Sequence, residues 1–181
     1  MMRRSLFGLA VAMAVTVNAT VCAQERDHVT MHEMHMAGMS IDHRQVVDFP
    51  PAMRAHNLAS MRDHLQALSE ILAAMAAGRY AEAGRIADAR LGMNSPAAAG
   101  CKAEAPTDGT QVSTPPSMEH QMALAMPEAM RKIGLDMHMS ASTFAVEARK
   151  AGRTGDTKPA LAALSRVTRR CTACHANFRI R

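Results

Sequence analysis

The chain of 181 residues has very few aromatic side chains: four phenylalanines, one tyrosine and no tryptophan. Aromatic residues supply much of the buried area of most cores. The core of this protein therefore needs another large apolar group to complete it. Basic side chains form no run and the formal net charge is only +5, unlike the basic stripe of a nucleic-acid-binding protein. No catalytic triad or phosphate-binding loop is recognisable, so we do not expect a dedicated enzyme.

Long apolar runs are also absent, except at the N-terminus. Residues 1–4 are short and basic, residues 6–17 are almost wholly apolar, and small residues follow at 21–23. This pattern predicts a secretory signal peptide over residues 1–23, cleaved after Ala23, because the run is too short to span a bilayer. A lipoprotein site at Cys22 is disfavoured because the usual leucine is missing before it. We expect an exported, periplasmic protein without stable membrane insertion.

Cysteine is scarce, with four in the chain, but two stand three apart near the C-terminus in Cys171-Thr-Ala-Cys174-His175. Two cysteines at this spacing followed by histidine form the attachment sequence for a c-type haem. Helical positions three and four apart share one face. Both sulfurs can therefore bond to one haem while the His175 imidazole reaches the iron as an axial ligand.

Three other interpretations of this motif are weaker. A structural zinc site needs four N/S ligands, and the chain has no second Cys-x-x-Cys. A thioredoxin-like redox pair needs a βαβ pattern, and no strand-like alternating run is present. A disulfide across three helical residues would be strained. Cys101 then stays unpaired, and we expect an inert filler rather than an intermolecular bridge.

A Met/His-rich stretch follows the predicted cleavage site and has no helical or strand period. It contains His28, Met31, His32, Met34, His35, Met36 and Met39. We interpret residues 24–49 as a disordered leader. Thioether and imidazole groups suit copper, with methionine selecting Cu(I), so copper binding by this leader is an alternative function.

From residue 50 the sequence predicts helices separated by proline and glycine. Pro50-Pro51 favours a helix start and Gly78 its end. An apolar stripe runs between them through Arg54, Leu58, Met61, Leu65, Leu68, Leu72 and Met75. A second helix is predicted over 80–91, with Tyr80, Ala83, Ala87 and Leu91 inward. Residues 92–117 form a long connection, and a short helical piece follows at 118–126.

The third predicted helix starts at Pro127 and stops at Gly152 or Gly155, with the inward stripe Met130, Ile133, Met137, Ser140, Phe144 and Ala148. Asp156 or Thr157 caps the fourth helix. Its inward face is predicted to hold Leu161, Leu164, Thr168, Cys171, His175 and Phe178. The fold class is therefore all-α, an antiparallel four-helix bundle over residues 50–181 with the haem projecting into it.

These features resemble the class II c-type cytochromes, the cytochrome c′ family, over residues 50–181. Phe178 and Arg179 follow the haem motif, where the family more often has tyrosine and arginine, and Arg54-Ala-His-Asn-Leu58 is similar to its first-helix motif. The resemblance implies that Leu58 covers the distal face of the haem and that Arg54 and Arg179 lie near it. From the sequence alone, Arg54 either pairs with a haem propionate or extends to water. The short second helix, the long connection and the leader depart from the family.

The residue opposite His175 decides the chemistry. Leu58 cannot ligate iron, so a site beneath it stays open and favours nitric oxide or carbon monoxide. Met61 in that place closes the site and raises the reduction potential, as in an electron carrier. His56 and His64 are disfavoured by their helical phase. Electron transfer with redox partner proteins is the preferred function and NO or CO binding an alternative; the resemblance also implies a homodimer.

Overall fold

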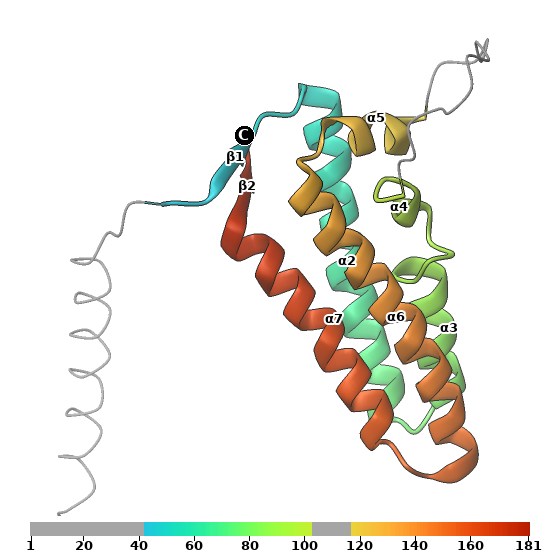
Figure 1. Cartoon of the computed structure of the whole chain (residues 1–181). Coiled ribbons are helices and arrows are strands. Elements are labelled where there is room, and N and C mark those ends of the chain that lie inside the picture. The colour runs from blue at the N-terminus through green and yellow to red at the C-terminus, as the bar shows by residue number, and fades with distance from the viewer. Residues whose placement is uncertain (1–41, 103–116) are drawn as a thin grey trace, which may run out of the picture. The chain divides into compact units, whose positions relative to one another are not determined.

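Helices dominate the computed structural model, which describes residues 42–102 and 117–181. The main helices are α2 (Pro51–Ala76), α3 (Tyr80–Arg90), α6 (Glu128–Thr154) and α7 (Lys158–Asn177), and the short helices α4 (Pro96–Ala99) and α5 (Met118–Ala125) lie between α3 and α6. The predicted all-α class is confirmed for these residues (Figure 1). The signal peptide, the Met/His stretch and residues 103–116 lie outside the described part, and everything below concerns the unit that begins at His43.

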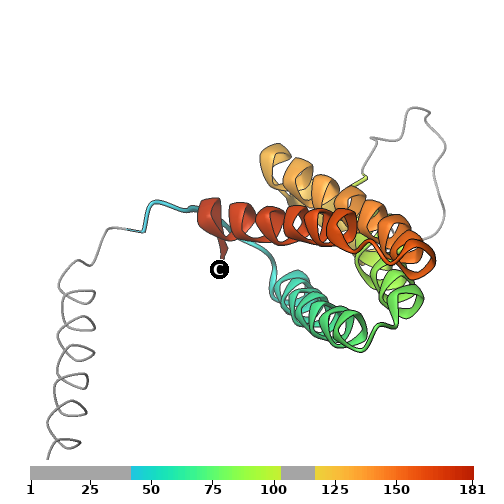
Figure 2. The same ribbon diagram turned by 90° about the horizontal axis from the view of Figure 1, so that it is seen from below.

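The four main helices pack in chain order, α2 on α3, α3 on α6 and α6 on α7. In Figure 2, α7 lies along α6, and α2 lies apart from α7 on the side of α3. A Cβ atom added to Gly84 in α3 would lie 2.8 Å from the Ala145 carbonyl oxygen in α6. This close approach leaves room only for small side chains between α3 and α6.

The core is accordingly rich in alanine, and its largest fully buried side chains are few. The buried alanines of the main helices are Ala67, Ala74, Ala83, Ala87, Ala141, Ala145, Ala148, Ala151, Ala160 and Ala163, and the large, fully buried side chains are Phe144, Ile71, Leu91, His138 and Val167. The helices supply little core volume of their own, as the scarcity of aromatic residues predicts.

The predicted inward stripe of α2 is wrong by about one residue. Leu58, Leu65 and Leu72 are 42%, 69% and 54% exposed. The buried residues are Met53, Asn57, His64, Ala67, Ile71 and Ala74, while Leu68 and Met75 are half-buried against the core. Small residues face the neighbouring helices because α2 packs closely on α3. Leu65 and Leu72, with Leu68, border a second cavity of about 560 Å³ between α2 and α7.

The predicted face of α7 needs a similar correction. Leu161, Thr168 and His175 are exposed, and the buried side chains are Ala160, Ala163, Leu164 and Val167. Cys171 continues this face and packs, half-buried, against the main core. Because α6 and α7 pack closely, alanines fit between them best. The face of α7 that points inward is therefore not its most apolar face.

Two short strands were not anticipated. β1 (Gln45–Val47) pairs in parallel with β2 (Phe178–Ile180), and Gln45 lies opposite Phe178. Val47 and Phe49 are buried in one cluster with Phe178. Residues 45–49 are therefore ordered, although the sequence assigned them to a disordered leader, and they hold the chain directly after the Cys-x-x-Cys-His motif.

Other elements follow the prediction. In α6, Met130, Met137, Phe144 and Ala148 are buried, and the helix ends at Gly155, whose φ is +75°. Helices α3 and α5 lie where the sequence placed them, whereas α4 falls within the predicted connection. None of the helices in the described ranges is both long and apolar enough to cross a lipid bilayer.

Candidate functional site

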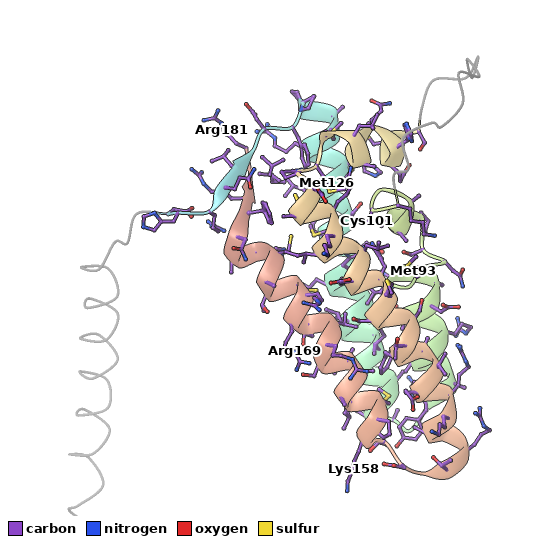
Figure 3. The ribbon with its side chains drawn as sticks, in the orientation of Figure 1. Met93, Cys101, Met126, Lys158, Arg169 and Arg181 are labelled. Atoms are coloured by element: carbon purple, nitrogen blue, oxygen red, sulfur yellow. The ribbon has the colours of Figure 1, made fainter. Side chains whose placement is uncertain are left out.

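A cavity of about 400 Å³ is lined by residues of α2, α5, α6, the C-terminus of α7 and β2. Figure 1 shows these elements near one another at the end of the bundle that carries β2. This volume is in the range of small-molecule and cofactor sites. Its lining is mostly apolar and includes the methionines Met61, Met122, Met126, Met130 and Met137. Met126, at the end of α5, and Cys101, after α4, mark this region in Figure 3.

The haem-attachment motif lies on the wall of this cavity. Cys174 and His175 line it directly, and Cys171, one turn earlier, is half-buried on the same side of α7. Burial raises the pKa of both thiols, so both stay protonated at neutral pH. The Arg44 side chain, close to β1, donates a hydrogen bond of 3.4 Å to the His175 carbonyl oxygen. Two of the three motif residues therefore lie at the cavity, and Cys171 continues the same helix toward the main core.

Phe178 and Arg179, which follow the motif after two further residues, also lie at the cavity. Phe178 begins β2, is buried and packs in the cluster with Phe49 and Met53. Arg179 is exposed, and it lines the cavity where it can meet a negative charge at the rim.

The α2 candidates are placed less uniformly. Leu58 lines the cavity although it is 42% exposed, and Met61 lines it while half-buried. Arg54 is exposed and is not one of the described residues that line this cavity. The structure therefore brings Leu58 and Met61 to the site and leaves Arg54 on the outer side of α2.

Two histidines that sequence reasoning set aside or overlooked face the same cavity. His64 on α2 is 8% exposed and His138 on α6 is 2% exposed. Their ring centroids lie 5.8 Å apart and the rings are nearly perpendicular, at 83°. The spacing of Gly134, His138, Ala141 and Ala145 by four, three and four residues shows that His138 shares a face with the small residues of α6.

The hydrogen bonding of the cavity histidines differs. His138 Nδ1 lies 2.7 Å from the Leu91 carbonyl oxygen, and because a carbonyl only accepts, Nδ1 carries the proton. His56 Nε2 lies 3.2 Å from Glu119 Oε1. His64 Nε2 is buried and has no hydrogen-bond partner within the described part of the chain.

Both buried histidines are neutral at pH 7. Burial, followed by the nearby His138, lowers the pKa of His64 to about 4. Burial also lowers the pKa of His138, and the Leu91 carbonyl and Lys102 have smaller, opposing effects. A neutral imidazole keeps one nitrogen lone pair, which can accept a proton or bind a metal.

Cys101 occupies a notch on the same wall. It is half-buried, and a Cβ atom added to Gly134 would lie 2.6 Å from its sulfur. Burial and the nearby Cys174 raise the pKa of the Cys101 thiol to about 11. This placement favours the interpretation of Cys101 as a filler. Across residues 42–102 and 117–181, no three His, Cys, Asp or Glu side chains are grouped as metal ligands.

Comparisons of the chain with protein-family models, with curated proteins and with solved structures gave no match. The chemistry of the site therefore rests on its own residues. Cys174 and His175 border a largely apolar cavity, Cys171 lies one turn before them, and His64, whose buried Nε2 has no partner among the described residues, lines the same cavity. This donor set fits a covalently attached haem.

Proposed function

We propose that this chain is a mono-haem c-type cytochrome of the class II kind that transfers electrons in the periplasm. The observation that carries the proposal is the position of Cys174 and His175 on the wall of the apolar cavity, with Cys171 one turn before them. The cofactor would supply an iron centre that takes up and releases one electron. The proposed architecture is a four-helix bundle formed by α2, α3, α6 and α7.

The roles of the residues follow from their chemistry. Cys171 and Cys174 would form the two thioether bonds, and His175 would be an axial ligand. The methionine-rich wall would exclude water from the site. Arg179, exposed at the rim, would balance the charge of a propionate. A redox centre held near the surface in this way needs no substrate pocket.

Covalent attachment is tested first. The full chain is exported in a host with a haem-attachment system, and its intact mass and haem-stained gel band are recorded. We expect the mass of the processed chain plus one haem, and loss of the covalent haem in Cys171→Ser and Cys174→Ser. Cys101→Ser is the matched control and should keep it. A wild-type protein that weighs only its amino acids would refute the proposal.

Redox function is tested on the same protein. We expect reversible one-electron oxidation and reduction by spectroelectrochemistry, and rapid electron exchange with a small soluble redox protein. Haem that is attached but cannot be cycled reversibly between the two states would exclude an electron carrier.

Gas binding is the second candidate, and one observation favours it: Leu58, which cannot ligate iron, lines the cavity. Under this alternative the site stays open to NO or CO. A reduced spectrum that shifts at low CO concentration would support it, and a spectrum that CO leaves unchanged would contradict it.

A further inference from the structure

His64 carries the one buried side-chain nitrogen or oxygen atom in the described residues that has no hydrogen-bond partner. A buried polar atom without a partner costs about 1–3 kcal/mol. Such atoms are uncommon in native proteins and often mark a missing ion or water. His64 is 8% exposed and lines the same cavity as His175. A cofactor in this cavity would therefore lie beside the His64 ring, whose Nε2 has no partner among the described residues.

The other candidates on α2 are less suited to ligate a metal there. Leu58 has no donor atom. His56 is already engaged by Glu119, at 3.2 Å. Met61 lines the cavity but is only half-buried, on a wall that has four further methionines, so its thioether is one of several packing groups.

His138 has the contacts of a positioning residue. A backbone carbonyl that accepts the N–H of one ring nitrogen fixes the orientation of a histidine ring. His138 does this through Nδ1 and the Leu91 carbonyl, at 2.7 Å. Its ring stands edge-to-face against the His64 ring at 5.8 Å, so the His64 ring is restrained from α6 as well as by its own helix.

We propose that His64 Nε2 is the sixth ligand of the haem iron, on the side away from His175, with His138 as its positioning residue. This inference rests on the proposed function. It differs from the expectation that Leu58 or Met61 lies opposite His175. Two imidazole ligands would close the site to CO and NO, and they would hold the reduction potential below that of a Met/His pair.

The test uses the exported protein with its covalent haem. Optical spectra of both oxidation states, with and without CO, and low-temperature electron paramagnetic resonance report spin state and ligand type. We expect a low-spin wild type that lacks the charge-transfer band of a methionine ligand. His64→Leu should become high-spin and bind CO at least about tenfold more tightly. Met61→Leu, one turn away on the same wall, and His56→Gln are matched controls that should stay low-spin.

Rescue separates ligation from a structural role. His64→Gly leaves space for free imidazole, which should restore the low-spin spectrum when added, whereas His64→Leu should not respond. His138→Gln should keep the His64 ligand but bind CO faster, because the His64 ring is less restrained. Intact mass verifies the haem in every variant, so a chain without haem refutes the proposed function and not this inference alone.

Three outcomes would overturn the inference while leaving a haem protein in place. The first is a high-spin wild type. The second is a low-spin spectrum that survives in His64→Gly without imidazole. The third is loss of the low-spin state in Met61→Leu but not in His64→Leu. If no His64 variant matures, the wild-type spectrum still decides, because a methionine charge-transfer band excludes two histidine ligands.

Discussion

The rotation of α2 about its own axis can be tested with two adjacent residues. Ile71 is completely buried and Leu72 is 54% exposed. Truncating each to alanine removes a similar volume at neighbouring positions of one helix. Alanine has the highest helix propensity, so helix formation does not penalise either change. The difference between the two variants therefore reports which of the two residues faces the core.

The expected magnitudes differ several-fold. Ile→Ala at a fully buried position costs about 2–5 kcal/mol, because apolar transfer energy is lost and a cavity is left. Ile71 belongs to the main core cluster, so Ile71→Ala should fall within this range. An exposed substitution usually changes stability by less than about 0.5 kcal/mol, which is the expectation for Leu72→Ala.

The measurement is urea or guanidinium unfolding of the haem-containing protein, followed by circular dichroism at pH 7. Equal slopes in wild type and variants show that the midpoints can be compared. A larger loss in Leu72→Ala than in Ile71→Ala would refute the reasoning. It would also rotate α2 so that Leu65, and not His64, faces the cavity, because His64 and Ile71 are seven residues apart on one face.

Four further predictions concern His64, Gly134, Cys101 and the Met/His-rich stretch. Below about pH 6.5 the unfolded chain takes up a proton at His64 that the folded chain does not, because burial lowers its folded pKa to about 4. Through His64 the free energy of unfolding should therefore fall by about 2.4 kcal/mol between pH 7 and pH 4.5, and the total fall should be smaller by about this amount in His64→Gln; equal losses in unfolding titrations would contradict this. Gly134→Ala should destabilise the protein by about 1–3 kcal/mol through overpacking against Cys101. Cys101→Ala in the same chain should recover most of that loss, and additive effects would exclude the contact. The Cys101 thiol, whose pKa is raised to about 11, should react with iodoacetamide at pH 8 far more slowly than free cysteine, as followed by mass; an equal rate would show an accessible thiol. Signal-free protein should retain Cu(I) through residues 24–41, and no excess over a variant lacking them after desalting would end that hypothesis.

Local signals were enough to predict where most helices begin and end. Proline in the first turn of α2 and α7 and glycines at positive φ after α2 and α6 fix those boundaries through backbone sterics. The Cys-x-x-Cys-His spacing also predicted that the motif would share one side of a helix. Most of the stripe of α6 was predicted correctly because Met130, Met137 and Phe144, which step by seven residues, are buried.

The rotation of α2 could not be predicted from the sequence, because its large apolar leucines are not the buried residues. Helix α2 has two faces on which residues recur every three or four positions. One face carries the leucines, and the other carries small residues together with Asn57 and His64. Hydrophobicity favours the leucines, but the distance between helices favours small residues, and that distance is a tertiary property. The β1–β2 pair was not predicted because strands of three residues are too short to show the alternation of polar and apolar side chains.

The same ambiguity connects fold to function. If the leucine face of α2 lay inward, Leu65 would replace His64 at the cavity, and the imidazole that we propose as an iron ligand would be lost. With the observed face inward, Leu58 and His64 both line the cavity, whereas Leu65 borders the second cavity between α2 and α7. The proposed gas-binding and electron-transfer functions therefore differ in whether Leu58 or His64 lies over the cofactor. The stability of the Ile71 and Leu72 variants tests the rotation, and the spin state of the His64 variants tests the ligand that this rotation makes available.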